Sequence, residues 1–429
     1  MQISKYLEQE WKPALGCTEP ASIAWAAASA AELAAGEIVS AHLVCDARIY
    51  KNCYAVGIPH SLGKTGILWA LAIGAKLPNS SAGLESFRQA DEEVLGQAQR
   101  LVSSGAVTVK VDTSQKELLV DCRVTGTKGA GRAVVRREHS LLTMLEKDGR
   151  SVPVPDAGVV AGADAASLRK NLVSVSFSEL MDAAASIESG DEQRLREGIE
   201  RNLAIAHHGA HLFPRRFFSM MGGDSVTRLS RLVFAGVHAR MSGEDFTVMS
   251  LAGSGNKGIT VSVPLALWGE DNAHDQRRIY EALVLACMVT SATTHNLGTL
   301  SAVCGCSNAA GIGLAAGLVY LEDGKENQLS LAMNNMVGNV TGMICDGAKI
   351  GCAMKTMTAV DAAFRSAALA LSDIGIPQED GIVGRDGKES LFNLGRIARL
   401  GMKGTDQEIL KIMEEKLARR APAKNDRPL

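Results

Sequence analysis

Residues 307–317 read Ser307-Asn-Ala-Ala-Gly-Ile-Gly-Leu-Ala-Ala-Gly317, a run built almost entirely from small residues. Glycine costs a helix up to about 1 kcal/mol relative to alanine, so several glycines in a helical pattern need compensation. Close approach of neighbouring helices around a buried site would supply it, and so would tight packing in an ordinary core. The run therefore predicts closely packed helices in the C-terminal half of the chain.

Outward from this run, the 429-residue chain divides into a mixed part and a helical part. In the first 150 residues, the patterns predict helices over 3–11, 21–35, 63–75 and 84–102, and strands over 39–49, 54–58, 107–111, 117–124 and 132–137. Beyond residue 165 they predict helices over 177–187, 192–208, 225–240, 275–293, 301–321, 328–339, 359–372 and 406–419. The predicted fold class is α+β, with an N-terminal mixed α/β unit followed by a mostly helical, small-residue-rich domain.

The expected domains follow from this division. We predict an α+β domain over 1–150, a linker over 151–165 rich in Gly, Pro, Asp and Ala, a mainly helical domain over 166–420, and a flexible tail over 421–429.

Charge and hydropathy exclude several classes of protein. Lys and Arg total 45 against 47 for Asp and Glu, a net charge of −2 without a basic block, so neither nucleic acid nor an anionic membrane is expected as a partner. The longest apolar stretches fall short of the roughly 20 residues that a membrane-spanning helix needs. No signal-peptide pattern follows Met1, and a cytoplasmic location is expected.

A glycine-rich loop, Gly253-Ser-Gly-Asn-Lys-Gly258, has the spelling GxGxxG. A dinucleotide site needs those glycines to open a helix within a βαβ unit, whereas β-branched residues closed by Pro264 follow here. We therefore reject a nucleotide site. Successive N–H groups could form an anion nest, with Ser254 and Asn256 adding hydrogen bonds suited to a carboxylate, and a purely structural turn is an equal alternative.

Two further motifs are weaker. The Gly57…Gly63-Lys64-Thr65 segment has one residue too many between its glycines for a P-loop, which favours a turn. His207, His208 and His211 form HHxxH, but no Glu intervenes to act as a base. A helix C-terminus decorated with histidines explains this motif better.

The nine cysteines form an odd number in a chain without a signal-peptide pattern, which indicates reduced thiols. Cys345 and Cys352 are seven residues apart, Cys304-Gly-Cys306 adds two thiols, and Cys17 follows a glycine. Thiolate sulfur is the usual ligand of iron–sulfur clusters, but the chain has no compact CxxC set. The spacing of the cysteines alone does not distinguish ligands of an iron–sulfur cluster from ordinary buried thiols.

Four stretches carry a resemblance: Pro13-Ala-Leu-Gly-Cys-Thr-Glu-Pro20, Gly253-Ser-Gly-Asn-Lys-Gly-Ile-Thr260, Gly342-Met-Ile-Cys-Asp-Gly-Ala348 and Cys352-Ala-Met-Lys355. In this order they resemble the L-cysteine desulfidase family of bacteria and archaea, which is related to the α-chain of iron–sulfur L-serine dehydratases. The resemblance extends from about residue 10 to residue 415.

The resemblance implies a four-iron–four-sulfur (4Fe-4S) cluster held by Cys17, Cys304 and Cys345, with one iron open to substrate. Cys352 falls in a matching motif and is either a substitute ligand or a structural thiol, whereas Cys306 and Cys287 fall outside the pattern. The implied reaction is that of a lyase in cysteine catabolism. It converts L-cysteine to pyruvate, ammonia and sulfide by α,β-elimination, or dehydrates L-serine at the same site.

The substrate would be a small amino acid, gripped by Thr18, Ser254 and Asn256. The candidates for the general base are His295 and Lys355, with His60 as a further one. A pyridoxal-phosphate lyase and a non-catalytic iron–sulfur or amino-acid sensor are the alternatives, and a homo-oligomer is left open.

The chain departs from the family pattern at two places beside the glycine loop. It has His238 where the pattern more usually has Asp, and Lys257 where the pattern more usually has Gln. Both changes affect the expected substrate more than the expected cluster.

Overall fold

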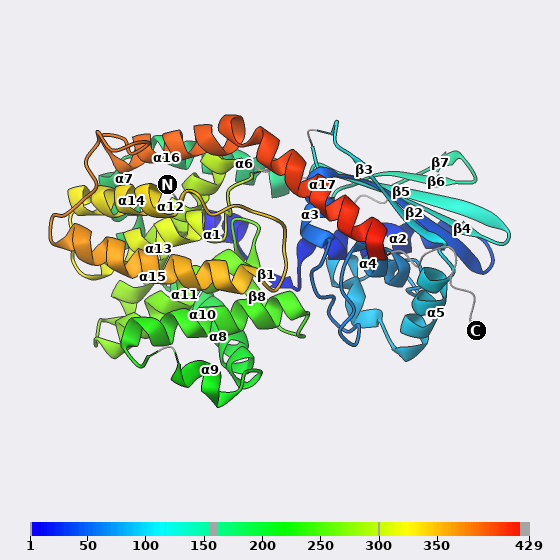
Figure 1. Cartoon of the computed structure of the whole chain (residues 1–429), viewed down its shortest axis with the longest axis horizontal. Coiled ribbons are helices and arrows are strands. Elements are labelled where there is room, and N and C mark those ends of the chain that lie inside the picture. The colour runs from blue at the N-terminus through cyan, green and yellow to red at the C-terminus, as the bar shows by residue number, and fades with distance from the viewer. Residues whose placement is uncertain (1, 116, 155–160, 221, 299–300, 421–429) are drawn as a thin grey trace.

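The computed structural model describes residues 2–115, 117–154, 161–220, 222–298 and 301–420. Within them, a part built on a six-stranded sheet lies beside a helical part (Figure 1). The α+β fold class predicted from the sequence is confirmed. The expected tail 421–429 and residues 155–160 of the expected linker lie outside the described residues, so the predicted domain limits stay a prediction.

The sheet-containing part holds α2 (Thr18–Leu33), β2 (Ile38–Asp46), α3 (Ala47–Cys53), α4 (Ile67–Gly74), the 3-10 helix η1 (Gly83–Gln89), α5 (Glu92–Ser103), β3 (Val107–Asp112), β4 (Leu119–Gly126), β5 (Gly129–Arg136), β6 (Leu142–Lys147) and β7 (Arg150–Val152). The strand order is β3-β2-β4-β5-β6-β7, with β2 and β3 parallel and the other pairs antiparallel.

The Ala-rich helix α2 packs against β4 and β5 of this sheet. A Cβ atom on Gly131 of β5 would lie 1.9 Å from the carbonyl oxygen of Ala30, so only glycine permits this approach. Alternate residues of β2 are buried, among them Ala41, Leu43 and Cys45, as expected for a strand with one covered face. Small residues therefore set the distance between helix and sheet.

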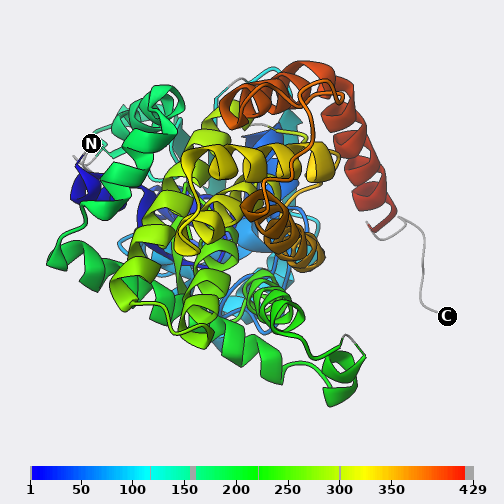
Figure 2. The same ribbon diagram turned by 90° about the vertical axis from the view of Figure 1, so that its left-hand side faces the viewer.

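The helical part contains α6 (Ala161–Ser174), α7 (Phe177–Ala185), α8 (Ser189–His211), α9 (Arg215–Ser219), α10 (Ser225–Ser242), α11 (Gly255–Asp271), α12 (Gln276–Leu297), α13 (Asn308–Leu321), α14 (Glu326–Val340), α15 (Cys352–Leu371), α16 (Gly387–Arg396) and the π-helical turn η2 (Ile397–Gly401). Figure 2 views the molecule from the side of these helices, which stack in front of the sheet-containing part.

The small-residue run lies in α13, which packs along α12. A Cβ on Gly313 would lie 2.1 Å from Thr290 Oγ1 and 2.5 Å from the carbonyl oxygen of Ala286. The two helices thus approach closely at this glycine, and the predicted tight helix packing is confirmed. Every described residue of α13 is buried.

Among the described residues, no helix combines the length and apolar character that crossing a membrane requires.

Both ends of the described chain connect the two parts. The N-terminal helix α1 (Ile3–Glu10) belongs to the core of the helical part, and β1 (Trp11–Leu15) pairs antiparallel with β8 (Thr247–Leu251). The C-terminal helix α17 (Lys403–Arg420), red in Figure 1, extends to α3 and contributes to the core of the sheet-containing part.

Two predictions near β2 were wrong, one a strand end and the other a whole strand. The strand ends at Asp46, because this carboxylate accepts hydrogen bonds from the amides of Arg48 and Ile49 and caps α3. The strand predicted over 54–58 is absent from the described elements. Its Gly57 instead packs on the backbone of α10, where a Cβ would lie 2.2 Å from the carbonyl carbon of Ser242.

The segment after the glycine loop is also not as predicted. The β-branched stretch belongs to α11, which tolerates Pro264 within it. Ile259, Val261 and Val263 are buried completely, so tertiary packing outweighs their preference for strands. The helix predicted over 301–321 begins only at Asn308, since residues 301–307 form a loop.

Candidate functional site

Two loops bring four cysteine side chains together. One loop precedes α13 and carries Cys304 and Cys306; the other precedes α15 and carries Cys345, with Cys352 as the first residue of that helix. The amide of Cys304 donates to the carbonyl of Met343 at 2.8 Å, and the amide of Cys345 donates to the carbonyl of Ala302 at 2.6 Å. We call Cys304, Cys306, Cys345 and Cys352 the four-thiol group.

Burial dominates the chemistry of three of these thiols, those of Cys304, Cys306 and Cys352. Cys304 is 4% exposed, and burial raises the pKa of its thiol to about 12, with the charges of Cys306 and Cys345 adding to the effect. Burial, followed by the charge of Cys352, raises the pKa of Cys306 to about 11. The pKa of Cys352 rises to about 12 through burial and then the charge of Cys304. These thiols are protonated at neutral pH unless a cation stabilises their thiolates.

The first turn of α11 lies against the four-thiol group. Ser254 is the N-cap of α11, and its Oγ lies 3.4 Å from Cys306 Sγ. A Cβ on Gly258 would lie 1.9 Å from the carbonyl oxygen of Met249, so glycine lets the helix start directly on β8. The glycines of the loop do open a helix, contrary to the prediction. They follow strand β8, which pairs antiparallel with β1 outside any βαβ unit.

Arg240 of α10 links Cys17 to the start of α11, because its side chain contacts both. Arg240 Nη1 lies 3.7 Å from Cys17 Sγ and 2.9 Å from Asn256 Oδ1, and Nη2 donates to the carbonyl of Gly16. Burial raises the pKa of Cys17 to about 11, with Arg240 opposing the rise. Cys17 is also the N-cap residue of α2, and Thr18 is the first residue of that helix.

Lys257 is a further candidate, which the sequence marks only as a departure from a family pattern. It lies in the first turn of α11 and is 6% exposed. Its Nζ donates to the carbonyl of Ala252 at 3.1 Å and to Thr294 Oγ1 at 3.0 Å. Burial lowers its pKa to about 8, partly offset by Cys306. Its place beside Ser254 and Asn256 was readable from the sequence, but its burial was not.

Lys355, one of the two predicted bases, feels the charges of the thiols of Cys304 and Cys345. Its Nζ donates to the carbonyl of Ile344 at 2.7 Å and to Asp346 Oδ1. Burial lowers the pKa of Lys355, but the bond to Asp346 and the charge of Cys304 outweigh burial and raise it overall. Lys355 is therefore protonated at neutral pH and suits electrostatic stabilisation better than proton abstraction.

His295 lies in the last turn of α12, next to the Thr294 that binds Lys257. Burial lowers its pKa, and the charges of Arg399, Arg169 and Lys170 lower it further. The imidazole is neutral at pH 7 and able to accept a proton. His60, the further candidate, lies 3.1 Å from Asp245 Oδ1.

The chain is similar to known proteins over most of its length. A family model described as the serine dehydratase alpha chain matches residues 94–411. The UPF0597 protein TTE0269 of Caldanaerobacter subterraneus subsp. tengcongensis is 34% identical over 418 residues, which cover 96% of this chain and 98% of that protein. The UPF0597 protein GSU1527 of Geobacter sulfurreducens is 36% identical over 421 residues, covering 96% and 97%.

The chain belongs to the serine dehydratase α-chain family. The predicted relationship to that family is confirmed, and membership points to a serine dehydratase-like lyase. The family model covers the four-thiol group, the first turn of α11 and Arg240, whereas Cys17 and Thr18 precede its first matched residue.

An iron–sulfur cluster, which the resemblance implies, needs cysteine thiolates on different iron atoms. The four-thiol group has this donor chemistry, and its members act on one another electrostatically. Among the described residues, no three His, Cys, Asp or Glu side chains are arranged to hold a single metal ion. Ligands of a multi-iron cluster lie further apart than ligands of one ion. The donor chemistry of these thiols is the kind that an iron–sulfur cluster would use.

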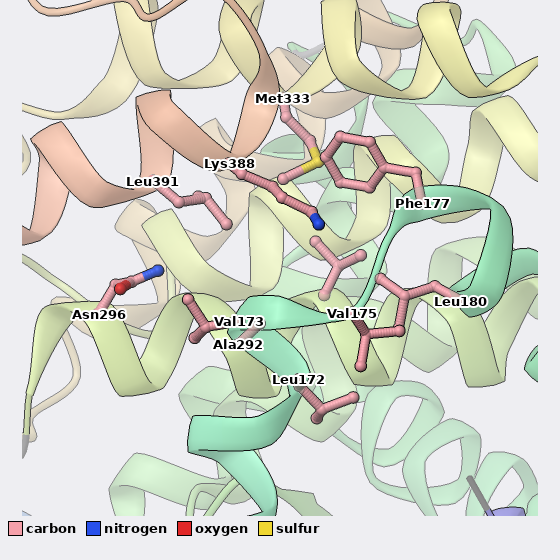
Figure 3. A pocket seen from close by; sticks show the side chains of 11 residues that line it. Leu172, Val173, Val175, Phe177, Leu180, Ala292, Asn296, Met333, Lys388 and Leu391 are labelled. Atoms are coloured by element: carbon pink, nitrogen blue, oxygen red, sulfur yellow. The ribbon is translucent and has the colours of Figure 1, made fainter.

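A separate small cavity lies between α6, α7, α12 and α16 (Figure 3). Its lining is mostly apolar, with Lys388 and Asn296 as the polar exceptions, and its volume is about 20 Å³. Such a space holds one water molecule rather than an amino acid. The candidate site is therefore the junction of the four-thiol group with α11, not this cavity.

Proposed function

We propose that this chain is an iron–sulfur lyase that catalyses α,β-elimination of a small L-amino acid, with L-cysteine as the favoured substrate. The supporting observation is that Cys304 and Cys345 lie on loops joined by backbone hydrogen bonds, beside polar groups of α11 suited to an amino acid. The products are pyruvate, ammonia and sulfide. L-serine, giving pyruvate and ammonia, is the second candidate substrate, favoured by family membership.

In this proposal Cys304 and Cys345 are two of the three ligands of a 4Fe-4S cluster. Cys17 is the third ligand by the motif resemblance. Cys352 is the alternative third ligand, supported by its electrostatic interaction with Cys304 and Cys345. A bound cluster with an open iron would supply a Lewis acid for the leaving sulfur or oxygen.

The chain's own residues bind the substrate and move its protons. Ser254, Asn256 and Thr18 are proposed to bind the carboxylate and amine, which fixes the Cα–H bond relative to a base. His295 is the proposed base because its lowered pKa leaves it neutral. Removal of the α-proton and cleavage of the Cβ–S bond yield hydrosulfide and aminoacrylate, and water converts the latter to pyruvate and ammonia.

The test is an anaerobic preparation of the whole chain. Iron and acid-labile sulfide are determined on one portion, and pyruvate formation from L-cysteine and from L-serine is followed on another. We expect about four irons and four sulfides per chain and pyruvate from at least one substrate. Full activity of a colourless, iron-free sample would exclude the proposal. Loss of activity on treatment with borohydride, which reduces a Schiff base, would favour a pyridoxal-phosphate enzyme instead.

A further inference from the structure

Two buried cations contact the start of α11, each through different partners and neither with a carboxylate. Arg240 is 4% exposed and Lys257 is 6% exposed. Among the described residues, no carboxylate oxygen lies within 4.0 Å of the charged nitrogens of either side chain. Desolvation of a charge is costly, and buried cations are normally paired with an anion. Two buried cations without a carboxylate at one helix start therefore favour an anion there.

The hydrogen bonds of Lys257 leave it incompletely satisfied. Its ammonium has three donors, and two of them go to the neutral oxygens of Ala252 and Thr294. The turn at Gly305 lies over this ammonium, since a Cβ there would lie 3.5 Å from Lys257 Cε. Gly305 has no side chain and is half-buried, so on this side backbone alone covers Lys257.

Arg240 and the backbone of α11 add to the positive potential. Arg240 Nε is buried without a hydrogen-bond partner, and a Cβ on Gly255 would lie 2.4 Å from it. The first N–H groups of a helix have no partner within the helix, and the N-terminal end of its dipole is positive. α11 is 17 residues long, so this dipole is fully developed. Ser254 and Asn256 contribute neutral polar groups at the same place.

We propose that Lys257, together with the first turn of α11, binds the α-carboxylate of an amino acid, and that Arg240 is the positioning residue for this turn. The identity of the ligand rests on the proposed function. Arg240 holds the turn through Asn256 Oδ1, and it holds the Gly16–Cys17 turn with its other nitrogen. The site accepts L-amino acids with a free carboxylate and discriminates against amides and decarboxylated amines.

The experiment uses L-alanine, which has the carboxylate and amine but no leaving group, and L-alaninamide, which lacks the carboxylate. Their binding is measured by calorimetry on the anaerobic full chain, for wild type, Lys257→Met and Lys257→Arg. Lys411→Met, at an exposed position of α17, is the control for loss of a lysine. Iron content and the visible spectrum are recorded for each variant.

We expect wild type and Lys411→Met to bind L-alanine and to reject L-alaninamide. Loss of a charge-assisted hydrogen bond should weaken L-alanine binding at least about tenfold in Lys257→Met, with partial retention in Lys257→Arg. Iron content should stay unchanged. A melting temperature of Lys257→Met no lower than that of wild type would show that the lysine is not there for folding. If Lys257→Met does not fold, Lys257→Gln takes its place.

Three results would overturn the inference. The first is unchanged L-alanine binding in the folded variant. The second is loss of iron on removal of the lysine, which would mean that Lys257 compensates the charge of the thiols. The third is equal competition by inorganic phosphate, which would indicate an unselective anion site. Wild-type binding of L-alanine without pyruvate from any substrate would refute the proposed function and leave this inference standing.

Discussion

Lys51 of α3 donates a hydrogen bond of 2.5 Å to Asp406 of α17, although 355 residues separate them in sequence. Lys51 is 3% exposed, and its Nζ also lies 3.4 Å from the carbonyl oxygen of Ser301. A Cβ on Gly347 would lie 2.0 Å from the carbonyl oxygen of Lys51. One lysine thus contacts the C-terminal helix and both loops that carry the four-thiol group.

Replacement of Asp406 by Ala should therefore destabilise the protein and loosen the loop that precedes Cys304. The variant leaves the ammonium of Lys51 buried without its carboxylate, which we expect to lower the free energy of unfolding by roughly 2 kcal/mol. Thermal unfolding with an iron determination measures both effects. Glu408→Gln, at an exposed position of the same helix, is the control. Equal stability of the two variants would show that the ion pair contributes little.

The thiols provide a second prediction. Cys304→Ala and Cys345→Ala should each abolish both the brown colour and turnover of anaerobic protein. Cys287→Ala, a buried change within α12, should keep both. Between Cys17→Ala and Cys352→Ala, the variant that loses iron identifies the third ligand. Colour and activity in Cys304→Ala would contradict the proposed cluster.

The buried ammonium of Lys257 predicts a pH-dependent stability difference. Burial lowers its pKa from 10.5 to about 8; Cys306, Glu10 and Cys304 oppose the lowering, and Arg169 adds to it. Between pH 8 and 10.5 the unfolded chain binds more protons at this residue than the folded chain, so this contribution to stability rises with pH. The full cost, about 3 kcal/mol, is present below pH 8.

Lys257→Met removes this cost. We expect the variant to melt above wild type at pH 7.5, and the gap in melting temperature to narrow by pH 9.5. Differential scanning calorimetry of both proteins across this range measures it. A gap that is constant with pH would show that folding does not lower the pKa of this lysine.

The proposed base gives a further prediction. Burial and neighbouring cations lower the pKa of His295 from 6.5. We therefore expect kcat/KM to rise with pH along an acidic limb whose apparent pKa lies below 6.5. His295→Gln should reduce kcat by roughly 10²- to 10⁴-fold and remove this acidic limb. Lys355→Met is the comparison, because a protonated lysine would change the rate without moving that limb. An unaltered pH profile in His295→Gln would exclude the histidine as the base.

The local sequence pattern was sufficient to predict those helices and strands whose own residues carry the period of the structure. The alternation of β2 and the small-residue run of α13 were readable because burial of one strand face, or of a whole helix, imposes a period on the sequence. The α+β class and the family relationship followed from such patterns and from four short motifs. The helical state of residues 259–264 was not predicted, since packing on all sides overrode β-branched preference.

The candidate site shows the same division more sharply. The sequence by itself marked Cys304, Cys345, Ser254 and Asn256, because cysteine and glycine-rich motifs can be recognised without a structure. Only the tertiary structure decided that backbone hydrogen bonds join the loops of Cys304 and Cys345, and that Lys257 is buried without a carboxylate. Neighbours in sequence carry no record of which distant loop covers a side chain. Desolvation, which decides what a charge does, is set by that cover.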